Sequence, residues 1–430
     1  RAPRTPSPTA PSEPRSGRVI GQDRPMARPL EGIRVLDFSR VLAGPHCSRA
    51  LADLGAEVIK IEPPEGDITR FTQPRRNSVA SYYAQQNTGK ANLSLDLSKP
   101  EAIAIVERLV ATCDVVLENF RPGVMDRLGL GVEHLRSLRP ELVYVSINGY
   151  GASSPWSDRR AYAPVVGAEA GLTRSQGDAR GGHYANDRHS HADVYTALEA
   201  TVAVLAALNQ RHTTGLGQHV EVTMAQTMLY VNEHAHDALW DDTVPDGVIR
   251  SFGTGDYLVL QLGDGSDVIV SGHPAEAGTF EYFMRAIDRT DLIERDEFAD
   301  VAGRLANLSE IIEAIRTHAA SVANPEAYEA ILSRHRLAVG RLRTVSEFAA
   351  TDWAVATGAV VEVSDRGGGT IRVPQSPWTF SESTTGVTGE PRYRGEDNRH
   401  VLAGLGYSAE EIDRLESDGV LSSRVPKDAR

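Results

Sequence analysis

Hydrophobic and polar positions follow two alternating patterns along the first half of the chain. Residues 33–38 and 56–62 are short runs that are apolar at most positions, and residues 45–55 between them have helical spacing and end at Gly55. Nearly continuous apolar strands joined by helices are typical of a parallel sheet that is covered on both faces. The pattern therefore predicts an α/β fold whose first strand–helix–strand unit crosses over in the right-handed sense.

The same alternation continues toward the middle of the chain. It predicts strands at 92–97, 114–120, 142–151 and 218–224, and helices at 99–113, at 193–212 and from the last strand to about Trp240. Pro100 suits the first turn of its helix, because the N–H that proline lacks is unpaired there in any case. We expect these elements to extend one large parallel sheet.

The second half of the chain has a different pattern. Residues 241–275 are rich in glycine and aspartate, and residues 276–336 have helical spacing. Residues 359–374 read as a β-hairpin with a turn built from glycines. Two short helices separated by Gly406 are expected near the C-terminus.

These changes of pattern divide the chain into four segments. Residues 1–25 are rich in Pro, Ser and Arg and are expected to be a disordered extension, with Met26 as the natural start. A large domain is predicted at 26–224, and a second, smaller domain at 225–330. Residues 331–430 form the fourth segment.

Composition and charge narrow the class of protein. The 430 residues are 41% hydrophobic and 24% charged, and the formal net charge of -13 argues against a nucleic-acid partner. The two cysteines, Cys47 and Cys113, lie in apolar stretches and are expected to be buried free thiols of a reducing, cytoplasmic compartment. No apolar run reaches the roughly 18–20 residues that cross a bilayer, so we expect no membrane contact.

Several common catalytic and cofactor motifs are missing from the sequence. The turn after the first strand, DFSRVLAGP, is not a G-x-G-x-x-G turn, and neither a P-loop nor a G-x-S-x-G elbow occurs. His189 and His191 suggest a metal site, but i and i+2 side chains of an extended loop point to opposite sides, and no H-E-x-x-H or cysteine pair supports one. We therefore expect no metal and no permanently bound cofactor.

Asp193 stands where a polar loop passes into the long predicted helix. As a capping residue, it would satisfy unpaired backbone N–H groups and contribute about 1 kcal/mol. The same placement keeps the carboxylate ionised and oriented, and an ionised carboxylate is a competent nucleophile toward an activated acyl group. The residues alone leave both interpretations open.

Four blocks follow one another along the sequence: LEGIRVLDFSRVLAGPHCSRALADLGAEVIKIEPPEGD (30–67), ENFRPGVMDRLGLG (118–131), SINGYG (146–151) and ALNQRHTTGLGQHVEVTM (207–224). Together they resemble the family III CoA-transferases, the CaiB/BaiF group that includes formyl-CoA and carnitine-type enzymes and has α-methylacyl-CoA racemase as a relative. The resemblance implies a Rossmann-like, CoA-binding large domain built from both ends of the chain (26–224 and 331–430), with the smaller α+β domain (225–330) inserted. It also implies an interlocked-ring homodimer and transfer of coenzyme A between an acyl-CoA and a small carboxylic acid.

The resemblance also implies a set of site residues. The family's catalytic aspartate lies at a fixed distance before the turn TGLGQ (214–218), which corresponds to Asp193. The implied mechanism passes through an aspartyl mixed anhydride and an aspartyl-CoA thioester. Contacts with CoA are implied for Leu42, Ala43, Leu95, Asp96, Leu97, Ser98, Asn119, Phe120, Arg121, Arg127, Arg160 and Tyr162.

The sequence departs from the family near these residues. Ala192 stands where the family usually has glycine, and Leu42 where the formyl-CoA enzyme has glutamine. Pro63 replaces an arginine of some relatives, so a phosphate contact would come from elsewhere, such as Arg70. A racemase is an alternative, although the segment DRRAYAP lacks the histidine that a racemase would use. A CoA-binding homologue that has lost turnover is another.

Overall fold

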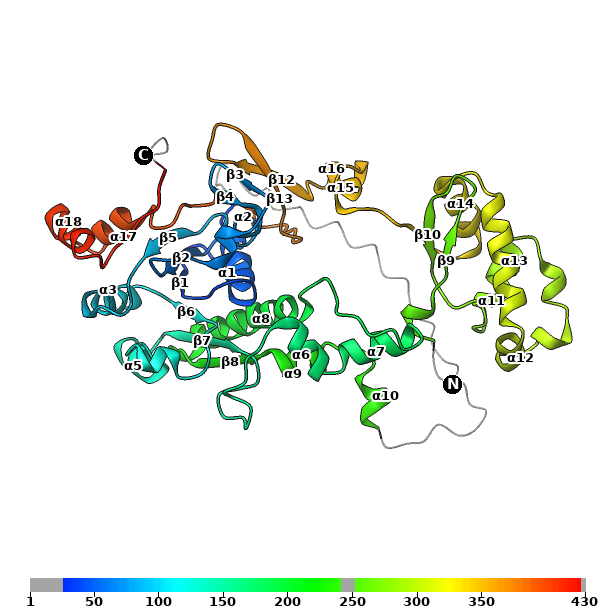
Figure 1. Ribbon diagram of the computed structural model, residues 1–430, viewed down its shortest axis with the longest axis horizontal. Coiled ribbons are helices and arrows are strands. Elements are labelled where there is room, and N and C mark those ends of the chain that lie inside the picture. Colours follow the sequence, from blue (N-terminus) through cyan, green and yellow to red (C-terminus); the bar gives the residue numbers. More distant parts are fainter. Residues whose placement is uncertain (1–25, 241–251, 427–430) are drawn as a thin grey trace, which may run out of the picture.

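The computed structural model describes residues 26–240 and 252–426. The predicted extension at 1–25 lies outside the described residues. Figure 1 shows a larger α/β part that contains both ends of the described chain, and a smaller part that lies apart from it.

A six-stranded sheet forms the centre of the larger part, with the strand order β5-β2-β1-β6-β7-β8. The strands are β1 (Arg34–Asp37), β2 (Glu57–Glu62), β5 (Ala91–Ser94), β6 (Val115–Glu118), β7 (Val143–Asn148) and β8 (His219–Thr223). All neighbouring strands are parallel. The prediction of a parallel α/β sheet is confirmed, and every strand predicted for this sheet is present.

The direction in which strands are added reverses in the middle of this sheet. From β1 the chain moves outward through β2 to β5, and it then returns to the other side of β1 and moves outward through β6, β7 and β8. At such a point the loops after neighbouring strands separate and leave a crevice at the carboxyl edge, where open α/β sheets bind ligands. The crevice of this sheet lies after β1 and β6.

Helices cover both faces of the sheet, because successive residues of a strand point to opposite sides. Val35 belongs to the apolar core beneath α1 (Ala43–Asp53) and α8 (His191–Thr214), and Leu36 belongs to the core on the other face. That second face is covered by α3 (Pro100–Val110), α5 (Val132–Leu138), α17 (Asn398–Gly404) and α18 (Ala409–Ser417). Each core contains one of the two cysteines, which are free and buried as expected.

The longest helix among the described residues, α8, is long and apolar enough to cross a membrane by its length and composition. This corrects the expectation that no segment reaches that length. One face of α8 packs on the sheet through Ala197, Ala200 and Val204. On its outer face, Leu198 and Val202 are exposed. Since core helices pass the same test of length and composition, it is weak evidence for a membrane span.

The smaller part has its own antiparallel sheet, ordered β11-β10-β9. Its strands are β9 (Val259–Gln261), β10 (Asp267–Val270) and β11 (Val339–Arg341), and its helices are α11 (Thr279–Ala286), α12 (Val301–Ala306), α13 (Leu308–Ser321) and α14 (Pro325–Leu332). They enclose a separate apolar core that includes Phe280 and Phe283. Because β11 completes this sheet, the core continues beyond residue 330; the division of the chain into domains stays a prediction.

The C-terminal residues return to the large sheet. β12 (Val360–Ser364) and β13 (Thr370–Pro374) form the predicted hairpin, and Arg366 and Gly368 in its turn have positive φ angles. Farther along, Leu421 forms a bridge with Leu95, directly after β5. The β5 edge of the sheet is therefore built from residues of both halves of the sequence.

Several short elements have no counterpart in the sequence pattern, because they offer too few positions to show a period. They include β3 (Arg75–Arg76), β4 (Val79–Ala80), α2 (Ser81–Asn87), α4 (Val124–Arg127), α6 (Ala163–Glu169), α7 (Leu172–Ala179), α15 (Val345–Phe348) and α16 (Asp352–Ala356). The single helix predicted up to Trp240 is wrong, since it is divided into α9 (Met224–Tyr230) and α10 (Ala235–Leu239).

Candidate active site

A cavity of about 280 Å³ lies at the carboxyl ends of β1, β6 and β7, where the strand order reverses. Its lining comes from the loops after these strands, from residues 157–162 before α6, and from the first turn of α8. Asp193 is the one carboxylate among the described residues of this lining. We call it the Asp193 cavity. No histidine belongs to the described lining, so the acid–base residue expected of a racemase is missing there.

The carboxylate of Asp193 lies near backbone N–H groups at the starts of two other helices. Burial raises the pKa of this carboxyl to about 6, and hydrogen bonds with the backbone of Ala43 and of Ala163 act in the opposite direction. At neutral pH most molecules therefore carry an ionised Asp193. The charge is less solvated than that of a surface aspartate, which favours its use as a nucleophile.

Three helices begin around this carboxylate. α1 begins at Ala43, α6 begins at Ala163, and α8 begins at His191, two residues before Asp193. Unpaired N–H groups and the helix dipole favour an anion at a helix N-terminus. Ser190, at the N-cap of α8, makes no side-chain capping bond. The backbone groups that act on Asp193 therefore belong to other helices, and this arrangement is not needed if Asp193 only caps its own helix.

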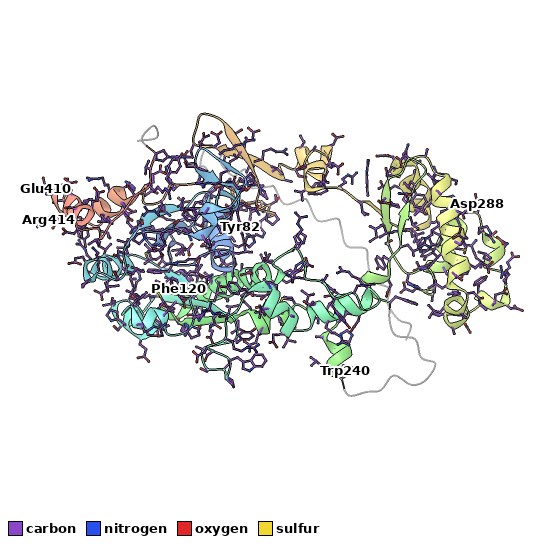
Figure 2. The ribbon with its side chains drawn as sticks, in the orientation of Figure 1. Tyr82, Phe120, Trp240, Asp288, Glu410 and Arg414 are labelled. Atoms are coloured by element: carbon purple, nitrogen blue, oxygen red, sulfur yellow. The ribbon has the colours of Figure 1, made fainter. Side chains whose placement is uncertain are left out.

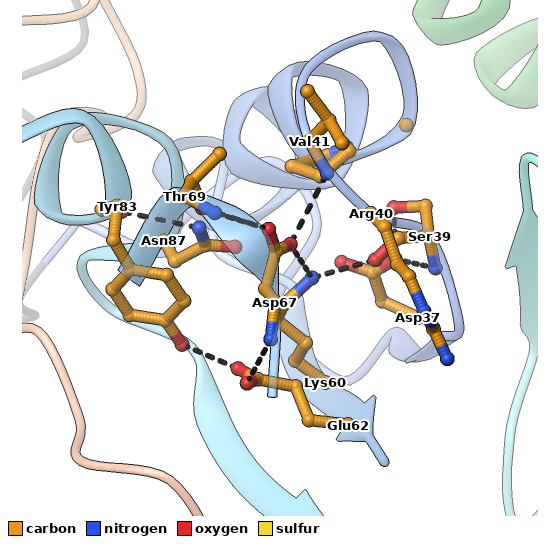
Figure 3. Close-up of polar contacts among 12 residues, drawn as sticks. Asp37, Ser39, Arg40, Val41, Lys60, Glu62, Asp67, Thr69, Tyr83 and Asn87 are labelled. Carbon is orange, nitrogen blue, oxygen red and sulfur yellow. Dashed lines mark hydrogen bonds and ion pairs between the residues drawn. The ribbon is translucent and has the colours of Figure 1, made fainter. Parts of the chain in front are cut away.

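The loop after β1, which forms one wall of the cavity, is tied down at successive residues (Figure 3). The Lys60 ammonium donates to the carbonyl of Ser39 at 2.6 Å, and the Val41 N–H donates to the Asp67 carboxylate at 3.1 Å. Between them, the backbone of Arg40 exchanges two hydrogen bonds with the Asn119 side chain. Val41 has a φ of +68°, a conformation that costs a β-branched residue about 1–3 kcal/mol. These bonds hold the strained residue in place.

The side chains that hold this loop belong to a buried group of charges, which we call the paired cluster: Asp37, Lys60, Asp67 and Lys90. Lys60 lies 3.3 Å from Asp67 and Lys90 lies 3.3 Å from Asp37, and none of the four side chains is more than 1% exposed. Burial lowers the pKa of Lys90 to about 7. Burial alone would raise the pKa of Asp37, but Lys90 and Lys60 outweigh it and lower that pKa.

Positive charge borders the cavity. The arginines in its lining are Arg40, Arg121, Arg159 and Arg160. The Arg159 guanidinium lies 4.3 Å from the ring centre of Trp156 and forms an ion pair with Glu169, so its place is fixed. Arg121 and Arg160 form no ion pair within residues 26–240 and 252–426. Guanidinium groups without a partner suit phosphate and carboxylate ligands.

The structure brings together only part of the residues predicted from the sequence. Those in the lining of the cavity are Asp193, Ala43, Asn119, Phe120, Arg121, Arg160 and Tyr162. Leu42 precedes α1 with its side chain buried, and Arg127 ends α4 outside this lining. The segment Leu95, Asp96, Leu97 and Ser98 follows β5, farther along the same edge of the sheet.

Other residues of the site have no signal in the sequence pattern. Arg40, Val41 and Arg159 enter the cavity because strand ends and the turn before α6 converge there. Tyr82, on α2, lies close to Asp193. Burial raises the pKa of Tyr82 to about 12, and the negative charge of Asp193 acts in the same direction. Figure 2 shows Tyr82 and Phe120 on the larger part of the molecule. The distance between α2 and α8 in the sequence conceals this proximity.

The histidine-containing loop before α8 differs from its prediction. His189 Nδ1 lies 3.3 Å and His191 Nε2 lies 3.2 Å from the oxygens of Asp187, so the expectation that the two histidines point to opposite sides is wrong. The three ligand-type groups lie within 4.8 Å of one another, a spacing at which they could hold a cation. His191 also stacks on Tyr195, which gives it a structural role. The absence of a bound metal stays a prediction.

Comparison with known proteins identifies the family. A model described as CoA-transferase family III matches residues 30–398, which is most of the chain. A probable fatty acyl-CoA transferase of Mycobacterium tuberculosis is 33% identical over 88% of this chain and 98% of its own length. A formyl-CoA:oxalate CoA-transferase of Streptomyces avermitilis is 31% identical over 92% of this chain and 100% of its own.

Solved structures agree with this assignment. A crystal structure of the same M. tuberculosis protein has a TM-score of 0.75 with 30% identity, and covers 88% of this chain and 100% of that one. A CaiB/BaiF family protein from Brucella suis has a TM-score of 0.74 with 27% identity over 88% of this chain and 100% of its own. The chain belongs to CoA-transferase family III, and it is a CoA-transferase.

Proposed function

We propose that the protein moves coenzyme A from an acyl-CoA donor to a carboxylic acid acceptor through covalent intermediates on Asp193. The observation that carries this proposal is the placement of Asp193 as the one carboxylate in the described lining of an arginine-bordered cavity, with its charge directed at two backbone amides. A covalent intermediate divides one difficult exchange into easier acyl-transfer steps. The relatives' names agree with a CoA thioester donor and a carboxylate acceptor.

The first half of the cycle transfers CoA to the enzyme. The ionised Asp193 attacks the thioester carbonyl of the donor, and collapse of the tetrahedral adduct breaks the C–S bond and releases CoA thiolate. The product is a mixed anhydride between Asp193 and the donor acid. The thiolate then attacks the aspartyl carbonyl of the anhydride, which forms an aspartyl-CoA thioester and releases the donor as a free carboxylate.

The second half repeats these steps with the acceptor. The acceptor carboxylate attacks the aspartyl thioester, releases CoA thiolate and forms a new mixed anhydride. The thiolate attacks the acceptor's acyl carbon, which yields the new acyl-CoA and restores the Asp193 carboxylate. Atoms and charge balance over the cycle without an added proton, oxidant or metal.

Backbone amides around Asp193 suit this sequence of steps. While Asp193 is a free carboxylate, the backbone N–H groups of Ala43 and Ala163 favour its charged form and lower its pKa. Once it is acylated, its charge is gone and the same N–H groups are available to the oxyanion of a tetrahedral adduct. Donors fixed before the reaction stabilise such charge without reorganisation, and removal of one typically costs about 10²–10³-fold in kcat.

Substitution of the nucleophile tests this proposal. We expect Asp193→Asn and Asp193→Ala to lose at least about 10³-fold in CoA transfer across a panel of acyl-CoA donors. The matched control is Asp187→Asn, which changes a carboxylate of the preceding loop that does not line the cavity and should keep most of the activity. Wild-type transfer in Asp193→Ala would contradict the mechanism. Deuterium exchange at the α-carbon of a 2-methylacyl-CoA would instead favour the racemase.

We also propose that the protein acts as a homodimer. Leu198 and Val202 on α8, together with Leu229 and Tyr230 on α9, are exposed apolar side chains of the larger part. Apolar surface of this kind often marks an interface with another chain. Size-exclusion chromatography with light scattering should give twice the mass of one chain, and a stable monomer at the assay concentration would contradict the dimer.

A further inference from the structure

A second pocket, of about 260 Å³, lies after the carboxyl ends of β2 and β5. Its lining includes Arg70, Arg75, Arg394 and Arg424, which come from both halves of the sequence. Glu65 is the one carboxylate among its described lining residues. The pocket therefore gathers far more positive than negative charge, although the chain as a whole is acidic.

Arg70 is already occupied by partners within the fold. Its guanidinium forms an ion pair with Glu62 at 2.7 Å and donates to the Tyr83 hydroxyl and to the carbonyl of Arg392. Its positive charge is thus matched by a buried carboxylate. Arg70 is a poor candidate for the phosphate contact that Pro63 does not supply.

The other three arginines, which we call the open arginine set, are Arg75, Arg394 and Arg424. None of them forms an ion pair within the described ranges 26–240 and 252–426. Arg394 donates to the hydroxyls of Ser94 and Ser422, and its carbonyl accepts the N–H of Arg424. Burial lowers the pKa of Arg394; Glu62 opposes this effect, and the guanidinium groups of Arg70 and Arg424 reinforce it. Cations that outnumber the carboxylates beside them are stabilised by an anionic ligand.

The pocket and the Asp193 cavity adjoin. Glu65 lines the pocket, Arg40 lines the cavity, and their charged groups lie 3.9 Å apart. Adjacent strands are about 4.8 Å apart, so the ends of β5 and β7, four places apart in the strand order, are separated by roughly 19 Å, and this is the span of the pocket and the cavity together. A ligand that occupies both must therefore be extended along the sheet edge and anionic at the end that lies in the pocket.

We propose that the open arginine set binds the terminal phosphate monoester of the CoA nucleotide, so that acyl-CoA lies along the sheet edge with its thioester at Asp193. This inference rests on the proposed function, because it takes CoA as the substrate. The phosphate monoester on the ribose is a dianion at the end of CoA that is remote from the sulfur. Guanidinium groups bind such a dianion through paired, charge-assisted hydrogen bonds. Inorganic phosphate has the same chemistry and is the other possible occupant.

Calorimetry on the full chain with CoA and with dephospho-CoA, which lacks this phosphate, tests the inference. We expect the wild type to bind CoA at least about tenfold more tightly than dephospho-CoA. Arg75→Gln and Arg424→Gln, both at exposed residues, should each reduce this ratio several-fold, and the double variant should bring it close to one without changing the affinity for dephospho-CoA. Arg394→Lys, which keeps the charge at a half-buried residue, should reduce the ratio less.

Arg76→Gln is the matched control, since Arg76 is the exposed neighbour of Arg75 and does not line this pocket. It should leave the ratio unchanged. A wild-type ratio near one, or a ratio that survives in the double variant, would overturn the inference. The inference is supported if inorganic phosphate competes with CoA but not with dephospho-CoA. If inorganic phosphate binds while CoA and dephospho-CoA bind equally tightly, the pocket is a site for free phosphate and the inference is overturned. No acyl donor is present, so the result is independent of whether Asp193 forms an adduct.

Discussion

Two groups of charge at the same edge of the sheet are built in opposite ways. In the paired cluster each buried lysine faces a buried carboxylate at 3.3 Å, and the side chains are almost completely excluded from water. Figure 3 shows the pair of Lys60 and Asp67. In the open arginine set, three cations border a pocket and form no ion pair within the described parts of the chain. The first group holds the loop beside Asp193, and the second group has charge left to offer to a ligand.

The difference separates the scaffold from the binding surface. A buried ion is costly unless it is paired and hydrogen-bonded, so loss of one partner leaves an uncompensated charge inside the protein. An exposed arginine such as Arg75 or Arg424 has no such dependence, and its replacement should change the affinity for an anion more than the stability of the fold. Substitutions in the two groups should therefore give opposite results when stability and binding are both measured.

The largest effect on stability is expected for the paired cluster. Asp37→Asn keeps the shape of the side chain but leaves Lys90 without its paired carboxylate, while Lys60 keeps its ion pair with Asp67. We expect the free energy of unfolding to fall by about 3–5 kcal/mol, as measured by urea denaturation. Asp96→Asn, at a carboxylate that is hardly buried, is the control and should change stability by less than about 0.5 kcal/mol. Equal effects of the two substitutions would contradict the role of the cluster.

The acid side of the stability profile should reflect Glu62, which accepts the backbone N–H of Asp67 in the paired cluster and forms an ion pair with Arg70. Burial alone would raise its pKa, but Arg70 outweighs burial and the pKa falls from 4.5 to about 2. Ionised Glu62 therefore stabilises the fold fully above about pH 4.5, and this contribution of about 3 kcal/mol is lost as the pH falls toward 2. In Glu62→Gln the free energy of unfolding should fall by about 3 kcal/mol less than in the wild type between pH 4.5 and pH 2. If the pH profile of stability is the same in both proteins, Glu62 is not responsible.

A smaller, stabilising effect is expected at Val41. Its side chain is exposed and its φ is +68°, so Val41→Gly removes strain without opening the core. We expect a gain of about 0.5–1 kcal/mol in the free energy of unfolding, because glycine adopts this φ readily. Thermal denaturation measures the change. A loss of stability would show that the bonds from Asp67 and Asn119 do not hold a strained loop.

The smallest effect is expected for the open arginine set. Arg75→Gln should change the free energy of unfolding by no more than about 0.5 kcal/mol, since the side chain is exposed and makes no ion pair in the described chain. The same variant should weaken the binding of CoA. If Arg75→Gln destabilised the protein as much as Asp37→Asn does, the distinction between the two groups of charge would fail.

The central sheet can be predicted from the sequence, because β1, β2, β5 and β6 are short segments with apolar residues at half or more of their positions, and segments with helical spacing separate them. Asp193 was found through its distance from a glycine-containing turn, a signal that belongs to the family resemblance. Arg40 and Val41 carried no signal, since a strand end and a distant carboxylate, Asp67, decide where they lie. The open arginine set joins residues from opposite ends of the chain, and spacing along a sequence does not reveal such an assembly.

Trapping the covalent intermediate tests the nucleophilic role of Asp193 most directly. The protein would be incubated with acyl-CoA donors and hydroxylamine at several pH values, and the modified peptide identified by mass spectrometry. We expect a hydroxamate at Asp193, with a yield that falls as the pH drops through about 6, because the protonated carboxyl does not attack a thioester. CoA transfer that proceeds with no label at Asp193, or with the label on another residue, would contradict the mechanism.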